Sequence, residues 1–406
     1  MDKIQIAFFF ISGFFISRLL IKAKIPEQIV NYFLDNKHAP PAKITFYLVF
    51  LSAGLSFFIP NVITVLTLIP VINVLLDAFN KANHPQKKLP TLFTLAVMYG
   101  ANIGGMGSIT ATPANGILVA FLGINNVPGS ESLTFANWLV WGIPLVIIFS
   151  SAAALILILF FGEWKLRKEK EYIDFDLSDK AENKSLILFL TASYFLTSII
   201  FSVWMFHTNN QIVVLIFTVI YTLTFIGFIF FVPVKNKLTE GKAVLLQIKD
   251  CYSNLPVKGF IFVGISIAVA GILYALNLQD KIAEIISRFL PSDISVLIIL
   301  LILALLTSFS TELLSNTAVQ FSLFVIILPF ALLNHFSPVE SLLVITLSST
   351  CAFMSPIATG VNGLAFGGVK GISLKSMLWV GLLVNLTGAI IISLWVHFVA
   401  GNIFPM

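Results

Sequence analysis

The sequence contains little charge, because Asp, Glu, Lys and Arg make up only 11% of its 406 residues. Soluble domains are about a quarter charged. So few charges exclude a soluble domain of this length, and most of the chain must face lipid or protein. Two cysteines, Cys251 and Cys351, are too few for a disulfide framework. The five histidines show no metal-ligand spacing, which argues against a zinc enzyme.

Long apolar runs are what the sequence has instead, and 58% of its residues are hydrophobic. Runs long enough to span a bilayer recur from one end to the other, so the chain is more than a soluble domain with one anchor. They must be helical, because backbone groups in lipid need partners within the segment and the runs lack the alternation of a β-barrel. We read the first run as a retained helix, not a signal peptide. Full-length spans are predicted at about 6–21, 138–161, 186–206, 212–232, 260–276 and 377–398.

Four further apolar stretches are interrupted. Gly- and Pro-rich segments break the spans at 92–122 and 341–367. Two pairs of shorter runs read as re-entrant helical hairpins with polar tips, because irregular backbone at membrane depth is tolerated where protein or a water-filled cavity lines it. The hairpin arms are predicted at 44–58 with 61–76, and at 294–306 with 316–333.

The chain repeats itself. The segment KIPEQIVNYFL at 24–34 resembles DKIAEIISRFL at 280–290, and ATPANG at 111–116 matches ATGVNG at 358–363. Ser108 then aligns with Ser355 in the same register. Two repeats are therefore predicted, at 1–161 and 257–406, separated at 162–256 by cytoplasmic linkers and two connecting helices. Each repeat contains a helix, a hairpin, a broken helix and a final helix.

The number of crossings predicts how the repeats are oriented. Each repeat crosses three times and the connecting helices add two, so the second repeat starts on the opposite face and its topology is inverted. Inverted repeats with broken helices are typical of secondary transporters. Of the 24 Lys and Arg, only Lys3, Arg18, Lys281 and Arg288 fall outside the segments assigned to one face, namely 22–43, 80–90, 162–185, 233–259 and 368–376. The positive-inside rule makes this face cytoplasmic and predicts an inner-membrane protein with both termini outside.

Four motifs resemble the divalent-anion:sodium symporter family of the wider ion transporter superfamily. They are TELLSNTA at 311–318, IGGMGS at 103–108, TPAN at 112–115 and CAFMSPIAT at 351–359. The resemblance covers nearly the whole chain and implies an all-α, elevator-type transporter fold. By this resemblance we expect a shortened and divergent member, in two respects. Its first tip reads Pro60-Asn61-Val62 where the family has Ser-Asn-Thr, and it starts without the family's extra N-terminal helices, which leaves a homodimer as an open alternative.

By this resemblance, two sodium sites and one substrate site are expected. One sodium would be bound by Ser56, Asn61, Gly107, Thr112 and Asn115. The other would be bound by Thr311, Ser315, Asn316, Ala358 and Asn362. The substrate would contact Asn61, Ser315, Asn316, Thr317 and Thr359. The amide of Asn suits both tasks, since its oxygen can bind a cation and its NH2 an anion. Any one of these residues taken alone is more often a helix cap or an interhelical hydrogen bond.

Other polar and aromatic residues received an interpretation as well. Glu312 lies inside the second hairpin, where a charge is expensive. It stabilises the tip, senses a proton for coupling, or merely caps local backbone amides. Arg18 reads as a side chain that extends to the cytoplasmic boundary. The tryptophans are typical of interface belts, as at Trp138, Trp141, Trp164 and Trp204.

The sequence thus predicts a transporter and no enzyme. We expect sodium-coupled uptake of a small anion, either a di- or tricarboxylate or an inorganic oxyanion, with Na+ as the coupling ion. An organic cofactor and nucleic acid are not expected; the partners are the anion and the bilayer. One alternative is a sodium/proton antiporter or oxyanion exporter of the same superfamily. A more distant one is an intramembrane enzyme, which would need a catalytic pair at membrane depth.

Overall fold

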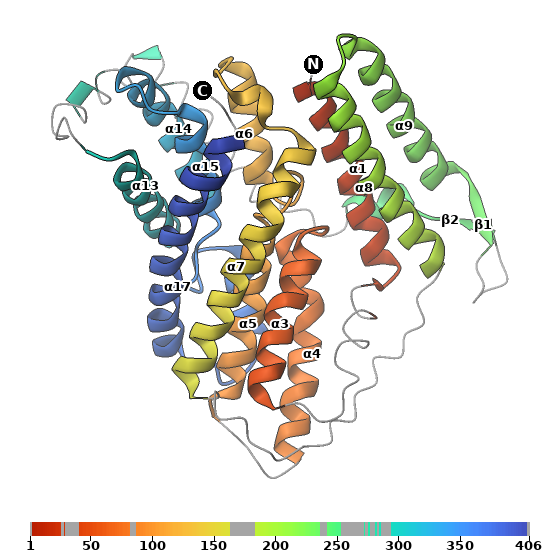
Figure 1. Ribbon diagram of the computed structural model, residues 1–406. Coiled ribbons are helices and arrows are strands. Elements are labelled where there is room, and N and C mark those ends of the chain that lie inside the picture. Colours follow the sequence, from red (N-terminus) through yellow and green to blue (C-terminus); the bar gives the residue numbers. More distant parts are fainter. Residues whose placement is uncertain are drawn as a thin grey trace.

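The computed structural model describes residues 2–25, 28, 40–81, 87–162, 183–235, 242–252, 272, 275–276, 281, 284–285 and 294–403. These parts of the chain are almost entirely helical (Figure 1). A short antiparallel ribbon pairs β1 (Pro233–Lys235) with β2 (Lys242–Val244). The first helices are α1 (Asp2–Lys22), α3 (Pro41–Ser56), α4 (Asn61–Lys81), α5 (Leu89–Gly104), α6 (Pro113–Ile124), the 3-10 turn η1 (Ser130–Ser132), α7 (Phe135–Phe161), α8 (Lys184–His207), α9 (Gln211–Phe231) and α10 (Ile248–Tyr252). The later ones are α13 (Val296–Thr311), α14 (Asn316–Leu333), α15 (Pro338–Ser349), α16 (Gly360–Gly368), α17 (Leu374–Trp395), the π-helical turn η2 (Val396–Ala400) and α18 (Gly401–Ile403).

Among the described residues, six helices are long and apolar enough to cross a membrane. They run over Ile4–Lys22, Phe135–Phe161, Lys184–His207, Gln211–Phe231, Asn316–Leu333 and Leu374–Ala400. Five agree with spans predicted from the sequence, and the predicted span at 260–276 lies outside the described residues except for 272 and 275–276. The sixth is α14, which the sequence indicated as a hairpin arm. It reaches spanning length because it stays apolar as far as Leu333, whereas α4 carries Asp77 and Lys81 in its last turns.

Local sequence explains the interruptions. Residues 57–60 join α3 to α4 and form the first tip together with the first two residues of α4. Residues 312–315 join α13 to α14 and form the second tip together with the first two residues of α14. The first break, residues 105–112, follows the Gly-rich end of α5 and stops at Pro113, whose fixed φ suits the first turn of α6. The second break, residues 350–359, separates α15 from α16. Helix hairpin, broken helix and long helix therefore occur in the same order in α3–α7 and in α13–α17.

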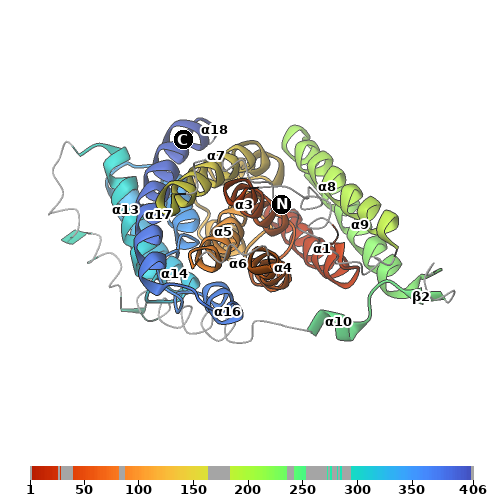
Figure 2. The same cartoon turned by 90° about the horizontal axis from the view of Figure 1, so that it is seen from below.

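The helices form three groups. Figure 2 shows α8 and α9 at one edge with α1 beside them, the helices α3–α6 in the middle, and α13, α14 and α17 at the other edge. Polar side chains tie the first group together, since Gln5 donates to Thr218 at 3.1 Å and Ser12 lies 3.3 Å from Thr222. Such interhelical hydrogen bonds hold membrane helices together where apolar contacts give little preference for protein over lipid.

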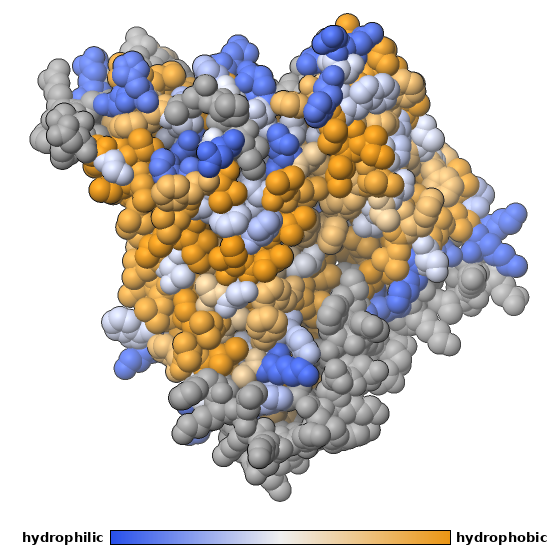
Figure 3. All heavy atoms as spheres, in the orientation of Figure 1, coloured by the Kyte–Doolittle hydropathy of each residue, from blue (hydrophilic) through white to orange (hydrophobic). Residues whose placement is uncertain are grey.

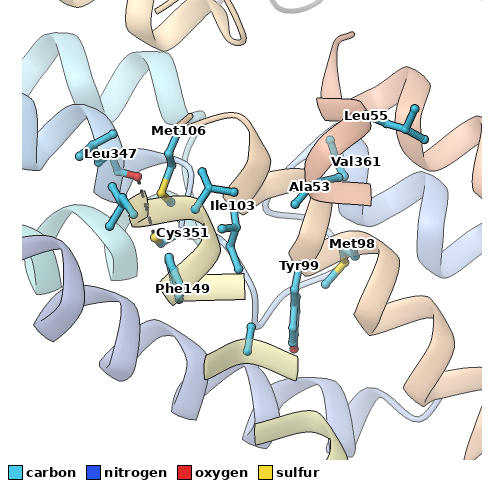
Figure 4. Close-up of a cluster of buried hydrophobic side chains, with 14 of the residues drawn as sticks. Ala53, Leu55, Met98, Tyr99, Ile103, Met106, Phe149, Leu347, Cys351 and Val361 are labelled. Carbon is cyan, nitrogen blue, oxygen red and sulfur yellow. Dashed lines mark hydrogen bonds between the residues drawn. The ribbon is translucent and has the colours of Figure 1, made fainter. Parts of the chain in front are cut away.

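Helix α5 lies in the interior, and all its residues except Pro90 are buried. It packs on α3, α4, α7, α16 and α17. Gly100 and Gly104 bring its backbone against α3, because a Cβ at these positions would overlap the backbone of Val49 and Ala53. Figure 4 shows α5 side chains such as Tyr99 and Ile103 between the first hairpin and residues of the second break, and the Tyr99 hydroxyl donates to Phe353 O at 3.2 Å. The apolar core therefore holds both breaks against one helix.

Outward-facing side chains are apolar over a broad band of the molecule (Figure 3). Long helices supply many of them, for instance Phe189 and Leu196 on α8 and Leu223 on α9, which are more than half exposed. A soluble protein would not leave such a surface in water. This band, together with the six long apolar helices, makes the chain an integral membrane protein.

Two interpretations from the sequence were wrong. Trp138 and Trp141 are fully buried, and the Trp138 indole N–H donates to Met106 O at 2.9 Å in the first break. They are packing residues, because α7 turns this face toward the broken helix. Arg18 is only 7% exposed and lies 5.0 Å from the ring of Phe14, so it packs within the protein and does not extend to water.

At the end of α1, Lys22 forms an exposed ion pair. Its ammonium lies 2.7 Å from the carboxylate of Asp250 on α10. Burial works against the Asp250 charge, but Lys22 and the backbone N–H of Gln247 outweigh it and hold the pKa of Asp250 below its ordinary value. This contact ties α1 to α10 at the basic end of the molecule.

Candidate functional site

The first tip lies directly against the first break. Gly107 has no side chain because the ring of Phe57 occupies the place where its Cβ would be. A Cβ on Gly105 would lie 3.2 Å from both amide atoms of Asn61 and would collide with the methyl group of Thr112. These two glycines therefore let the tip and the break approach closely, and they bring Asn61 and Thr112 to the same point.

Asn115, in the first turn of α6, holds the first break in shape. Its NH2 donates to Gly105 O at 3.0 Å and to Ser108 O at 2.8 Å. Its own oxygen is buried and has no hydrogen-bond partner among the described residues. The same is true of Asn61 Oδ1 and Thr112 Oγ1.

The five residues predicted for the first sodium thus behave in two ways. Asn61, Thr112 and Asn115 leave buried oxygens without partners beside Gly105. Gly107 shapes the backbone, and the Ser56 hydroxyl donates to Thr64 Oγ1 at 3.0 Å, which closes the tip. Buried oxygens without donors carry an energetic penalty, and a hard cation without its water shell removes it.

Asn362 holds the second break in the same way. Its NH2 donates to Ala352 O at 2.7 Å and to Ser355 O at 2.8 Å. These acceptors lie ten and seven residues before Asn362 (362 − 352 and 362 − 355), as Gly105 and Ser108 lie before Asn115 (115 − 105 and 115 − 108). The sequence alignment of the two ATxxNG motifs therefore corresponds to one local hydrogen-bond pattern.

The oxygen of Asn362 differs from that of Asn115 because it has partners. Thr359, the N-cap of α16, donates its hydroxyl to Asn362 Oδ1 at 2.9 Å and accepts from the Asn362 backbone N–H at 3.1 Å. Thr359, predicted for the substrate, and Asn362, predicted for the second sodium, are thus in direct contact. Ala358 is buried in the turn just before them.

The second tip presents polar groups around the start of α14. Ser315 and Thr317 have hydroxyls 3.0 Å apart, and the buried Asn316 Oδ1 has no partner in the described part of the chain. The Thr311 hydroxyl donates to Ser308 O at 2.8 Å within its own helix. One polar cluster is therefore formed by Ser315, Asn316 and Thr317. The hydroxyl of Thr311 instead donates its hydrogen to a backbone carbonyl of its own helix.

Glu312 connects the second tip to the second break. Its side chain is 6% exposed, and its two carboxylate oxygens accept from the backbone N–H groups of Met354 and Ser355, each at 2.8 Å. Asn385 on α17 donates to the same carboxylate at 2.8 Å. Of the readings left open by the sequence, capping of backbone amides matches these contacts, but the amides are 42 and 43 residues away and not local.

Asn102 is a site residue that the sequence analysis missed. It is buried on α5, its oxygen lies 3.5 Å from Asn61 Nδ2 and its nitrogen lies 3.4 Å from Asn362 Oδ1. The signal was present, because an amide inside an apolar membrane helix is costly unless it has a task.

Gln320 on α14 was missed as well. Its NH2 donates to Ala114 O at 2.8 Å and to Thr346 Oγ1 at 3.1 Å. Since Ala114 precedes Asn115, Gln320 joins the second hairpin to the first broken helix.

Comparison with known proteins identifies transporters as relatives of this chain. A sodium-dependent dicarboxylate transporter of Staphylococcus saprophyticus is 25% identical over 412 residues, covering 97% of this chain and 76% of the relative. The protein of the same description from Staphylococcus aureus strain NCTC 8325 has the same identity and coverage. An uncharacterised transporter of Haemophilus influenzae is 25% identical over 388 residues, covering 95% of this chain and 79% of the relative.

These relatives confirm the resemblance that the motifs indicated. Residues 3–324, most of the chain, match a family model described as a citrate transporter, CitMHS. A secondary transporter, and not an enzyme, is what both the relatives and the family point to. On this match the chain belongs to the CitMHS family of citrate transporters.

Proposed function

We propose that this protein is a sodium-coupled importer of a small anion, either a di- or tricarboxylate or an inorganic oxyanion. One observation carries the proposal: the buried oxygens of Asn61, Thr112 and Asn115 lack partners beside the first break. Neutral oxygens of this kind, on residues next to Gly105, suit a dehydrated sodium ion, which is bound in transporters by amide, hydroxyl and backbone oxygens at interrupted helices. The names of the Staphylococcus relatives, which specify sodium dependence, support this coupling ion.

The second tip supplies the anion site in this proposal. Ser315 and Thr317 offer hydroxyls, Asn316 offers an NH2, and the start of α14 adds the partial positive charge of a helix N-terminus. Thr359 and Asn61 are assigned to the same site as further substrate contacts. The family description and the relatives' names favour carboxylates over other anions.

Proton antiport is the nearest rival, and Glu312 is the residue on which it would depend. Met354, Ser355 and Asn385 all direct donors at its carboxylate oxygens. Three hydrogen bonds from two different segments hold the side chain in place. This favours a fixed structural carboxylate over a proton carrier.

Sodium-driven uptake tests the proposal. Proteoliposomes with an inward sodium gradient should accumulate radiolabelled succinate, citrate or sulfate, and should not do so with choline in place of sodium. Asn115→Ala and Asn362→Ala should each raise the half-saturating sodium concentration about tenfold or more, since a lost ligand to a charged group is worth about 1.5–3 kcal/mol. Uptake of all three anions at the same rate in choline would contradict sodium coupling.

The inverted repeats and an elevator movement are part of the proposal. The labels of both chain ends lie at the same end of the molecule in Figure 1, which accords with an even number of crossings. Lys22 ends α1, Lys88 precedes α5 and Lys235 follows α9, and these helix ends are assigned to the cytoplasm by the positive-inside rule. We therefore place both termini outside the inner membrane, with the α1, α8 and α9 group as a fixed scaffold and a homodimer as an open alternative.

Cysteine labelling tests this topology. In a Cys251→Ser background, a cysteine at Asn402 should react with an impermeant maleimide only from outside, and one at Lys242 only from inside. A cysteine at Val62, in the half-buried first tip, should react from both sides because an elevator exposes the site to each side in turn. Labelling of positions 402 and 242 from the same side would refute the inverted-repeat topology.

A further inference from the structure

Three asparagine side chains form a row between the two breaks. Asn61 Nδ2 donates to Asn102 Oδ1 at 3.5 Å, and Asn102 Nδ2 donates to Asn362 Oδ1 at 3.4 Å. Asn61 starts the first hairpin's second arm, and Asn362 lies in α16. Asn102 is the middle member, and it is 3% exposed on α5, whose residues are buried except for Pro90.

The second break determines which way each amide in the row faces. Two backbone carbonyls, of Ala352 and Ser355, require the NH2 of Asn362 to point toward them. The Asn362 oxygen then points toward Asn102, so Asn102 must orient its NH2 toward that oxygen to donate a hydrogen bond. Asn102 in turn presents its oxygen to Asn61, whose NH2 it accepts.

The consequence falls on the first sodium site. Because the NH2 of Asn61 is held by Asn102, Asn61 Oδ1 remains buried and without a partner beside Thr112 and Asn115. The orientation of a proposed first-site ligand thus depends, through Asn102, on the geometry of the second break.

We propose that Asn102 is a positioning residue that couples the two sodium sites. The inference rests on the proposed function and adds a cooperative link between the sites. Asn362 Oδ1 already accepts from Thr359 and from Asn102, and a carbonyl oxygen has two lone pairs. A sodium ion that binds this oxygen must displace one donor. When the Asn102 NH2 is displaced, Asn102 loses its contact with Asn362, and its contact with Asn61 at the first site then sets its position. By linkage, binding at either site therefore alters the affinity of the other by the same factor.

A sodium titration of thermal unfolding tests this without any knowledge of the transported anion. The purified protein should be stabilised by NaCl and not by choline chloride at equal ionic strength, and the sodium dependence of the wild type should have a Hill coefficient above 1. A ligand that binds only the folded state raises the unfolding temperature by mass action, so the curve reports binding. Asn102→Leu, which keeps the shape and removes the amide, should lower the Hill coefficient to about 1 and raise half-saturating sodium about fivefold or more.

Two matched comparisons separate coupling from packing. Ser52→Ala removes another buried polar group at the contact of α3 with α5, where the Ser52 hydroxyl donates to Val97 O at 2.6 Å. It should lower the unfolding temperature and leave the Hill coefficient unchanged. In an Asn115→Ala background, where the first site has lost its ligand, adding Asn102→Leu should change half-saturating sodium less than about twofold, since no coupling remains.

Each outcome decides the matter. Retention of cooperative sodium binding with unchanged half-saturation in Asn102→Leu would overturn the coupling role and leave the proposed function intact. Loss of cooperativity in Ser52→Ala as well would make the effect one of packing and would also overturn it. A wild type that does not respond to sodium would refute the proposed function and this inference together. If Asn102→Leu does not fold, Asn102→Ser takes its place with the same expected loss, because a serine hydroxyl is too short to span both amides.

Discussion

Replacing Asn316 with Ala is expected to abolish uptake of the anion. Asn316 is the first residue of α14, between Ser315 and Thr317, whose hydroxyls lie 3.0 Å apart. Its amide is the group of the second tip that can donate to an anion through NH2 and still present an oxygen to a cation. Loss of a hydrogen bond to a charged group costs about 1.5–3 kcal/mol, or about ten- to a hundredfold in affinity. Losing a cation ligand with the same substitution should bring the combined loss below detection.

The matched control lies at the other end of the same helix. Asn334, the C-cap of α14, donates its side-chain NH2 to Phe330 O at 2.9 Å. Asn334→Ala makes the same chemical change far from the second tip and should leave uptake within about twofold of the wild type, as a change at a distant site usually does. Sodium-driven uptake that persists in Asn316→Ala would remove the second tip from the substrate site.

The first tip provides the opposite test of the same site. Pro60 has no backbone N–H and Val62 no hydroxyl, so the first tip offers fewer donors than the second. A dicarboxylate that bridges both tips is therefore held weakly at one end, and a smaller or monovalent anion on the second tip is held nearly as well. Pro60→Ser combined with Val62→Thr should improve succinate affinity about tenfold, the value of one regained hydrogen bond to a charged group. No change in succinate affinity in the double variant would show that the substrate does not reach the first tip.

Glu312→Gln is expected to destabilise the folded protein strongly. Glu312 Oε1 accepts from both Met354 N and Asn385 Nδ2, and Oε2 accepts from Ser355 N. Glutamine can keep only one oxygen, so its NH2 must face a donor and leave that donor unsatisfied. The loss of the charge and of one acceptor should lower the free energy of unfolding by about 1.5–3 kcal/mol or more, measured as a fall in the unfolding temperature in detergent.

Two variants identify the cause of that fall. Glu131→Gln makes the same change at an exposed acid in η1 and should have no measurable effect. Asn385→Leu removes one donor to Glu312, and its effect should be non-additive with Glu312→Gln because the two side chains share a hydrogen bond. If Glu312→Gln unfolds at the wild-type temperature but loses the pH dependence of uptake, the carboxylate is a proton sensor and not a structural link.

Apolar runs and the positions of proline and glycine predicted most of the helices and their interruptions. Apolar runs located five long helices, because a span of about 20 residues out of water requires a continuous apolar sequence. Pro60, Pro113 and the glycines at 104–107 marked the first tip and the first break, because these residues act on their own backbone. The paired motifs around Asn115 and Asn362 predicted equivalent positions, and their side chains make equivalent hydrogen bonds.

The sequence alone could not tell which side of a membrane helix faces lipid and which faces protein, because both surroundings are apolar. Trp138 and Trp141 were therefore assigned to the interface, while the fold buries them against the first break. Contacts between distant segments were equally hidden. Glu312 finds its amides 42 and 43 residues away, and Asn102 reaches Asn362 across 260 residues. Local sequence thus determined the helices, their interruptions and the residue types at them, whereas only the packing of α5 between the two breaks decided which of those polar groups meet.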